Sequence, residues 1–145
     1  MKSTMGYIIY LNGSPITWKS KVHTNHSMST AEAGYVSLSA CTAECIYLQS
    51  LLEGTGFPQD STTLHVDNTA AIALTKGDVH HSRTRHIRLR WHFVRSEVAR
   101  GTVTIQHCPS EHLPAVKFEC TSVPFNTVQA WLRFTINRPV GKCQV

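Results

Sequence analysis

The feature that most constrains this chain is a long apolar helix predicted to begin at Ser29. Residues 29–32, Ser-Thr-Ala-Glu, form a capping box, in which the Ser hydroxyl and the Glu carboxylate each accept a hydrogen bond from a free backbone N–H group. Apolar side chains then cover one broad face of the helix: Tyr35, Val36, Leu38, Cys45, Ile46, Leu51 and Leu52. Gly54 and Gly56 end it. A helix this apolar has to be buried by other elements, so we expect a layered domain.

Shorter segments supply those other elements. Runs rich in β-branched and aromatic residues predict strands at 6–11, 16–19, 62–66 and 102–107. Apolar residues at helical spacing predict helices at 69–76 and 85–100, and a short amphipathic helix at 128–134. The length of 145 residues is that of one ordinary domain. This order of elements predicts a mixed α/β fold.

Composition excludes several classes of protein. With 41% hydrophobic and 16% charged residues, the chain does not have the composition of a disordered protein. Its apolar runs are too short to span a membrane and its first residues lack the apolar core of a secretory signal, so we expect no membrane partner. The five cysteines are irregularly spaced and include no CxxC pair, which favours a reducing, intracellular compartment.

The net charge of +5 is concentrated in one segment. Residues 83–100 hold six arginines and one acid, so this segment alone carries the whole excess of the chain. Within it Arg85, Arg88, His92 and Arg95 follow one another along one side of the predicted helix. A stripe of arginines is typical of a surface that binds phosphate groups of nucleic acid. The alternative is a solvated helix face without a partner.

Several linked motifs resemble a known family. They are 3–7 (STMGY), 16–21 (ITWKSK), 29–39 (STAEAGYVSLS), 66–74 (VDNTAAIAL) and 81–95 (HSRTRHIRLRWHFVR). In order and spacing, over roughly residues 2–113, they resemble the ribonuclease H domain at the C-terminal end of a copia-type retrotransposon Pol polyprotein.

The resemblance implies a ribonuclease H-like fold, a mixed sheet flanked by helices on both faces. It also implies hydrolysis of the RNA strand of an RNA·DNA hybrid, with Mg²⁺ or Mn²⁺ as cofactor. That chemistry needs clustered carboxylates, because they hold two metal ions about 4 Å apart. The expected partners are an RNA·DNA hybrid or another nucleic acid and the reverse transcriptase part of the same polyprotein, in the cytoplasm or the nucleus.

The four acidic positions of the family are only partly present. Carried over by the resemblance, Glu32 and Asp67 are the expected catalytic residues and metal ligands, whereas Gly34 replaces a second glutamate of the same stretch. The first acid belongs to a strand that would precede Ser3, and Ala115 stands at the fourth position. We therefore expect an inactive or weakly active nuclease. The expected nucleic-acid-binding residues are Lys19, Lys21, Arg83, Arg85, Arg88 and Arg95.

Some of these residues have simpler interpretations. Glu32 could serve only the capping box, and Asp67 could be only the N-cap of the helix that follows it. Cys41 and Cys45, four residues apart, are expected to be small core residues and not metal ligands. The three tryptophans are expected to pack in the core or on strands and not to stack on bases: Trp18, Trp91 and Trp131.

The missing first strand leaves a gap in the expected sheet. In the family that strand is central, between the hairpin and the strand that ends at Asp67, so its loss leaves two strand edges without backbone partners. Either the sheet closes across the gap, or another segment fills it, or the fold is only marginally stable.

We expect residues 1–120 to form the ribonuclease H-like domain, incomplete at its N-terminus. Residues 121–136 are expected to form a helical extension and residues 137–145 a flexible tail. Three functions remain open at this point: a metal-dependent ribonuclease, a non-catalytic remnant that binds nucleic acid through its basic helix, and a transposon fragment without function.

Overall fold

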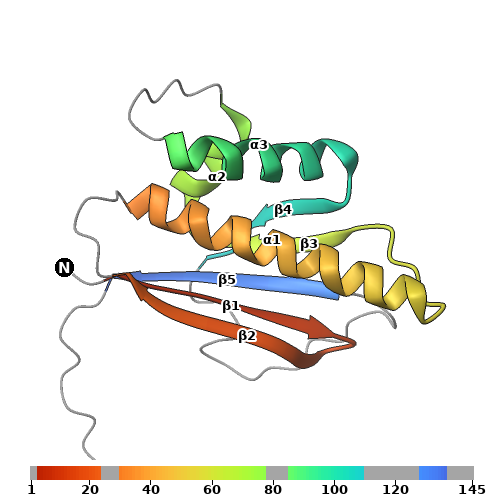
Figure 1. The fold of residues 1–145 in the computed structure, drawn as a ribbon. Coiled ribbons are helices and arrows are strands. Elements are labelled where there is room, and N and C mark those ends of the chain that lie inside the picture. Colours follow the sequence, from red (N-terminus) through yellow and green to blue (C-terminus); the bar gives the residue numbers. More distant parts are fainter. Residues whose placement is uncertain (1–2, 24–29, 78–84, 110–127, 137–145) are drawn as a thin grey trace, which may run out of the picture.

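The computed structural model describes residues 3–23, 30–77, 85–109 and 128–136. Its elements are, in chain order, β1 (Ser3–Leu11), β2 (Ser14–His23), α1 (Thr30–Gly54), β3 (Thr62–Val66), α2 (Thr69–Lys76), α3 (Arg85–Arg100), β4 (Val103–His107) and β5 (Val128–Ile136). The predicted elements at 62–66, 69–76 and 85–100 have the bounds that the sequence indicated. The mixed α/β, ribonuclease H-like fold is confirmed (Figure 1).

A tight hairpin joins β1 and β2. Asn12 and Gly13 both adopt positive φ, 52° and 76°, and the flanking residues Leu11 and Ser14 are paired. Positive φ at both positions of a two-residue loop is the conformation of a type I′ turn, which Asn-Gly favours because neither residue is strongly penalised there. Both strands are longer than predicted, because pairing continues from the turn to Ser3 and His23.

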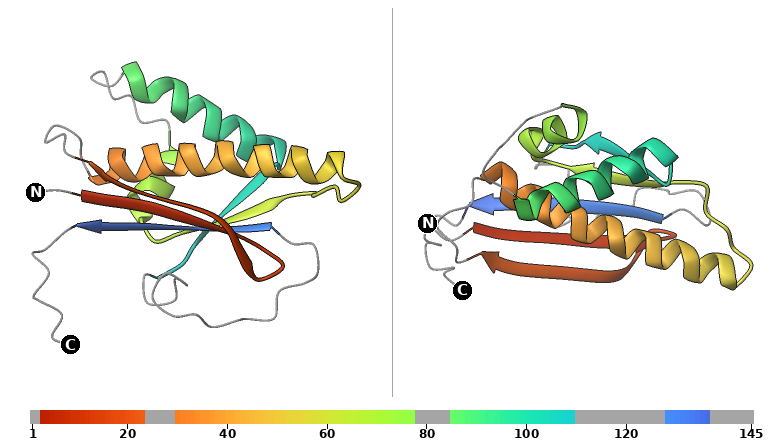
Figure 2. Two further views of the ribbon diagram at one scale, coloured as in Figure 1. Left: turned by 60° about the horizontal axis from the view of Figure 1, so that its bottom comes forward. Right: turned by 45° about the horizontal axis from the view of Figure 1, so that its top comes forward.

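The helix predicted at 128–134 is wrong, because residues 128–136 form strand β5. The five strands follow the order β2-β1-β5-β3-β4, so β5 is the central strand (Figure 2). It runs antiparallel to β1 along its whole length and parallel to β3. The segment therefore occupies the position between β1 and β3, for which the sequence predicted a gap. A strand satisfies the backbone groups on both open edges, which a helix beside the sheet cannot do.

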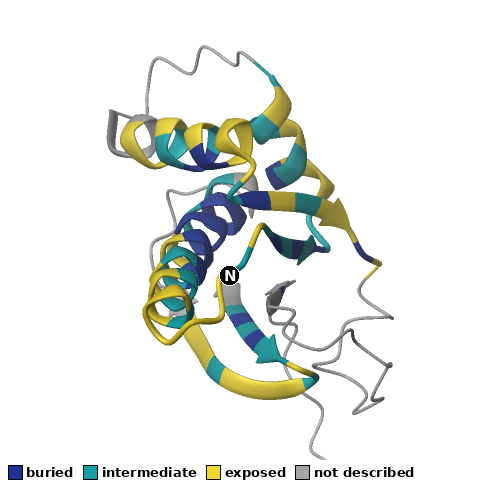
Figure 3. Ribbon diagram, turned by 90° about the vertical axis from the view of Figure 1, so that its right-hand side faces the viewer, coloured by how far each residue is buried: buried dark blue, intermediate teal, exposed yellow. Residues whose placement is uncertain are grey.

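The helices described in the structure lie on one face of the sheet. α1 packs across β1 and β5, α3 packs beside β4, and α2 contacts both other helices (Figure 1). The core lies between this helical layer and the sheet. Its buried side chains are Tyr7, Ile9, Tyr35, Leu38, Cys41, Cys45, Leu64, Val66, Val94, Val103 and Ala130 (Figure 3). Cys41 and Cys45 are free thiols in this core, as predicted.

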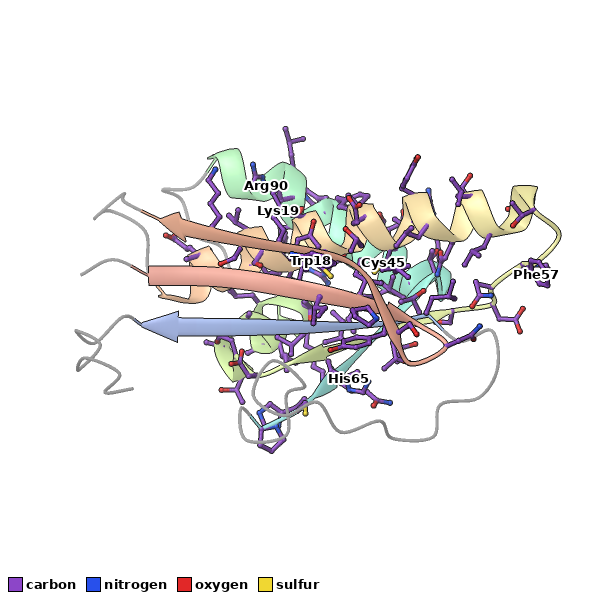
Figure 4. The ribbon with its side chains drawn as sticks, turned by 90° about the horizontal axis from the view of Figure 1, so that it is seen from below. Trp18, Lys19, Cys45, Phe57, His65 and Arg90 are labelled. Carbon is purple, nitrogen blue, oxygen red and sulfur yellow. The ribbon has the colours of Figure 1, made fainter. Side chains whose placement is uncertain are left out.

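Trp18 does not lie in the core. It is 70% exposed, on the edge strand β2, and pairs with Ile8. Because side chains alternate along β1 and Ile9 faces the helices, Ile8 and Trp18 lie on the opposite face (Figure 4). Sequence periodicity does not say which strand becomes an edge, so the prediction of a packed Trp18 is wrong.

The limits of the predicted domain, at residues 120 and 121, lie outside the described residues, as does the tail at 137–145. Among the described helices, none is long and apolar enough to cross a membrane.

Candidate nucleic-acid and metal-binding site

Asp67 directly follows the buried strand β3, at the point where α2 begins. The N-cap of α2 is Asn68, whose Oδ1 accepts hydrogen bonds from the N–H groups of Ala70 and Ala71 at 3.0 and 3.1 Å. Asp67 is therefore not the helix cap. Its carboxylate is close enough to Cys108 to raise the pKa of that thiol, although burial is the larger cause. Cys108 is fixed there because its N–H donates to the Val66 carbonyl at 3.0 Å.

Helix α1 packs against α2 next to Asp67, and Gly34 lies at this contact. A Cβ atom at position 34 would lie 2.7 Å from Nδ2 of Asn68 and 3.5 Å from Cβ of Ala71. Gly34, which by the resemblance stands in place of a second glutamate, therefore faces the start of α2. Glu32 is two residues earlier, so it projects from α1 about 200° away from Gly34. Glu32 is partly buried, and its role as a metal ligand stays a prediction.

Strand β5 restores the sheet beside Asp67 without restoring a carboxylate. Val66 pairs with Leu132 across the parallel strands β3 and β5. One residue further along each strand are Asp67 and Arg133, so Arg133 is the position of β5 beside Asp67. None of the nine residues of β5, VQAWLRFTI, is Asp or Glu. Within the described ranges, no group of three or more His, Cys, Asp and Glu residues is placed to hold a metal ion. Ala115 and its acidic neighbours Glu111 and Glu119 lie outside the described residues. The described donors therefore do not fit a pair of divalent ions.

Trp91 holds α3 against the other helices. Its indole N–H donates to the Leu74 carbonyl of α2 at 2.6 Å, and its own carbonyl accepts from the Tyr35 hydroxyl at 3.2 Å. The Arg95 guanidinium lies over its ring, 4.6 Å from the centroid. Burial raises the pKa of Tyr35, and the nearby Arg95 charge acts in the opposite direction. Trp91 is thus a packing residue, as predicted, and Arg95 takes part in that packing.

The outward side of α3 is exposed and carries Leu89, His92, Ser96 and Arg100, with Leu89 79% exposed and Arg100 paired with Glu97. Arg90 is exposed as well, but it lies about 100° around the helix from Leu89, outside this set. Arg90 was not among the predicted binding residues, although the arginine count of the segment included it. Arg85 and Arg88 lie on the first turn of α3, but their side chains, and all of Arg83, lie outside the described residues.

The buried face of α3 is rotated from the predicted one. The apolar spacing of Ile87, Trp91, Val94 and Val98 predicts that these four residues face inward, but Val98 is 37% exposed, whereas Glu97 is buried at 7% exposure. Glu97 can occupy the buried position because its carboxylate pairs with the Arg100 guanidinium at 2.9 Å.

Lys19 and Lys21 are exposed on β2. β2 is an edge strand of the sheet, whereas α3 lies in the helical layer, packed on α1 and beside β4 (Figure 1). The predicted lysines and the arginines of α3 therefore come from different layers of the fold.

Comparisons with known proteins identify relatives over most of the chain. Over 114 residues, 79% of this chain, the sequence is 32% identical to the retrovirus-related Pol polyprotein from transposon TNT 1-94 of Nicotiana tabacum. Over 106 residues, 72% of the chain, it is 37% and 36% identical to those from transposons RE2 and RE1 of Arabidopsis thaliana. These matches span only 9%, 7% and 7% of the polyproteins. No family model and no solved structure matches. The chain is therefore a homologue of a short region of the retrovirus-related Pol polyproteins of copia-type transposons.

Proposed function

We propose that this chain is a ribonuclease H-like domain that binds the backbone of RNA·DNA hybrids through α3, with hybrid hydrolysis abolished or severely reduced. The observation that carries the proposal is the pairing of Asp67's strand with β5, which has no carboxylate. The family reaction needs a cluster of carboxylates around two Mg²⁺ or Mn²⁺ ions, and only Glu32 and Asp67 remain of the predicted set.

The charge of β5 also argues against hydrolysis. A divalent ion beside Asp67 requires negative charge on the neighbouring strand, whereas the ionisable residue of β5 is an arginine. Gly34 supplies no ligand, and the space that a side chain there would need is held by Asn68. Both features reduce the affinity for metal ions at the end of β3.

Two features support binding through α3. The helix carries five of the six arginines of segment 83–100, and the Arg90 side chain is exposed. Packing of Trp91 against α1 and α2 fixes the helix to the domain. Arginine suits the phosphates of a duplex because its guanidinium donates two parallel hydrogen bonds.

Catalysis is tested with a labelled RNA·DNA hybrid in Mn²⁺, using the full chain beside Asp67→Asn. We expect no cleavage above background by either protein. Cleavage by the wild type that Asp67→Asn abolishes would overturn the proposed loss of activity, because it would show a working site that uses Asp67.

Binding is tested by the salt dependence of hybrid affinity. Because each neutralised phosphate contributes a slope of about 0.9 in log K against log salt, replacing Arg85, Arg88 and Arg90 with Gln should lower the slope by roughly two to three. Arg95 is kept in that variant because it packs on Trp91. A second variant, Lys19→Gln with Lys21→Gln, tests separately whether the predicted lysines of β2 contribute to the slope. An unchanged slope in the arginine variant would refute α3 as the binding surface and favour a fragment without function.

A further inference from the structure

The central strand β5 is joined to the rest of the sheet only after a long connection. β4 ends at His107 and β5 begins at Val128, so residues 108–127 separate them. Twenty residues can span up to about 65–70 Å when extended. The connection is therefore long enough for β5 to enter either its own sheet or that of a neighbouring molecule.

The position that β5 occupies is bounded on both sides by strand edges. On one side β1 pairs with it from Ser3 to Leu11, and on the other β3 pairs with it from Thr63 to Val66. β1 and β3 do not pair with each other. We call this position the slot. Both of its edges depend on an incoming strand for their hydrogen bonds, which makes the slot a place for strand addition.

Helix α1 holds the two sides of the slot in place independently of β5. On the β1 side, Tyr7 and Ile9 share the core with residues of α1. On the β3 side, the Gln49 side-chain amide of α1 donates to Thr62 Oγ1 at 2.6 Å and to the Thr102 carbonyl at 3.0 Å. α1 therefore crosses the slot and is attached to both halves of the sheet (Figure 1).

The slot accepts only a strand with a small residue at the level of Ala130. Ala130, fully buried, is in register with Ile9 on one side and Leu64 on the other, both of which are also fully buried. A small residue is needed between two larger ones at this level. The occupant must also be extended and free of proline, as VQAWLRFTI is.

We propose that the slot is a strand-acceptor site and that β5 of a second copy of this chain can fill it, giving a strand-exchanged dimer. Exchange preserves every pair that β5 makes, because the second copy presents the same residues to the same edges. The two forms then contain the same strand pairs and differ in the entropy of association, which is the condition under which strand exchange is accessible.

The test uses the register between Ile8 and Trp131, which are paired across β1 and β5. Opposed residues of antiparallel strands have Cα atoms about 4.5–5.5 Å apart, within the range of a disulfide. One full-length chain carries Ile8→Cys and another carries Trp131→Cys, both with Cys120→Ser and Cys143→Ser. The remaining cysteines, Cys41, Cys45 and Cys108, are buried. The two chains are unfolded under reducing conditions, mixed, refolded together and oxidised.

We expect a disulfide-linked heterodimer whose yield rises with protein concentration during refolding. A chain carrying both Ile8→Cys and Trp131→Cys is the positive control, and it should close an internal disulfide at low concentration. Ile8→Cys mixed with Thr135→Cys is the mismatched control, because Thr135 pairs with Thr4, and it should give no such product.

Two results would overturn the proposal. If the doubly substituted chain closes internally but the mixed single variants stay monomeric at every concentration, β5 does not exchange. If the doubly substituted chain does not close, or the mismatched pair crosslinks equally well, β5 does not occupy the slot in this register.

Discussion

Gly34 on α1 and Asn68 at the start of α2 are in such close contact that a Cβ atom at position 34 would lie 2.7 Å from Nδ2 of Asn68. The amide cannot easily turn away, because its Oδ1 accepts two N–H groups of α2. A side chain at position 34 would therefore disturb the N-cap of α2, next to Asp67.

Gly34→Ala should destabilise the fold, although alanine favours helix over glycine by about 1 kcal/mol. The new methyl group must displace Asn68, so both overpacking and loss of the cap contribute, and we expect the free energy of unfolding to fall by about 1–3 kcal/mol. Urea unfolding measures it. Gly54→Ala, with nothing within 4 Å of its Cβ position, is the matched control and should be neutral or stabilising. In an Asn68→Ala background, Gly34→Ala should cost less; additive costs would contradict this coupling.

Trp91→Phe should lower the free energy of unfolding by about 1–2 kcal/mol, since a partly buried hydrogen bond to the Leu74 carbonyl is lost while the ring volume is largely kept. The measurement is the urea midpoint followed by circular dichroism, which does not depend on the tryptophan itself. Trp18→Phe, at a 70% exposed position, is the control. Equal losses in the two variants would show that the Trp91 hydrogen bond does not stabilise the fold.

Alanine substitutions at Arg95 and Arg90 should differ in their effect on stability, because Arg95 packs on Trp91 whereas Arg90 is exposed. Arg95→Ala removes the cation–π contact with Trp91 and should cost about 0.5–1 kcal/mol of stability. Arg90→Ala changes an exposed side chain and should leave stability within about 0.5 kcal/mol of wild type. Thermal and urea unfolding of both variants test this, and a larger stability loss in Arg90→Ala than in Arg95→Ala would reverse the assignment.

His65 on β3 should make the fold sensitive to mild acid. Burial lowers the pKa of His65 from its ordinary value of about 6.5. The unfolded chain then takes up this proton more readily than the folded one, so stability is fully present above about pH 6.5 and falls as pH drops toward the folded-state pKa. His65→Gln should reduce the loss of urea resistance between about pH 7.5 and 5.5. Equal pH profiles for wild type and His65→Gln would exclude this role.

The sequence predicted those elements whose limits are marked locally. Asn68 caps α2, Gly77 follows its last residue, and Gly101 adopts positive φ at the end of α3, so 69–76 and 85–100 could be read from nearby residues alone. Residues 128–134 have apolar side chains compatible with either helix or strand. Their structure is decided by the open edges of β1 and β3, which are remote in sequence.

The surroundings of Asp67 were not predictable from the sequence. The motif pattern located Asp67, yet the cap role of Asn68 and its contact with Gly34 depend on how α1 crosses α2. The inward position of Glu97 likewise depends on its pairing with Arg100, which compensates for burial of a carboxylate that helical periodicity places outside.

The late position of β5 in the chain has a kinetic consequence. Ser3 pairs with Ile136 and Leu11 with Val128, so the central ladder joins the first and last strands that the structure describes. Such distant pairing gives a high contact order and slow folding, because most of the loop entropy is lost before these contacts form. On the ribosome, β1 and β3 are synthesised before β5, at about 5–20 residues per second. The nascent chain therefore exposes the unpaired edges of β1 and β3 until β5 emerges.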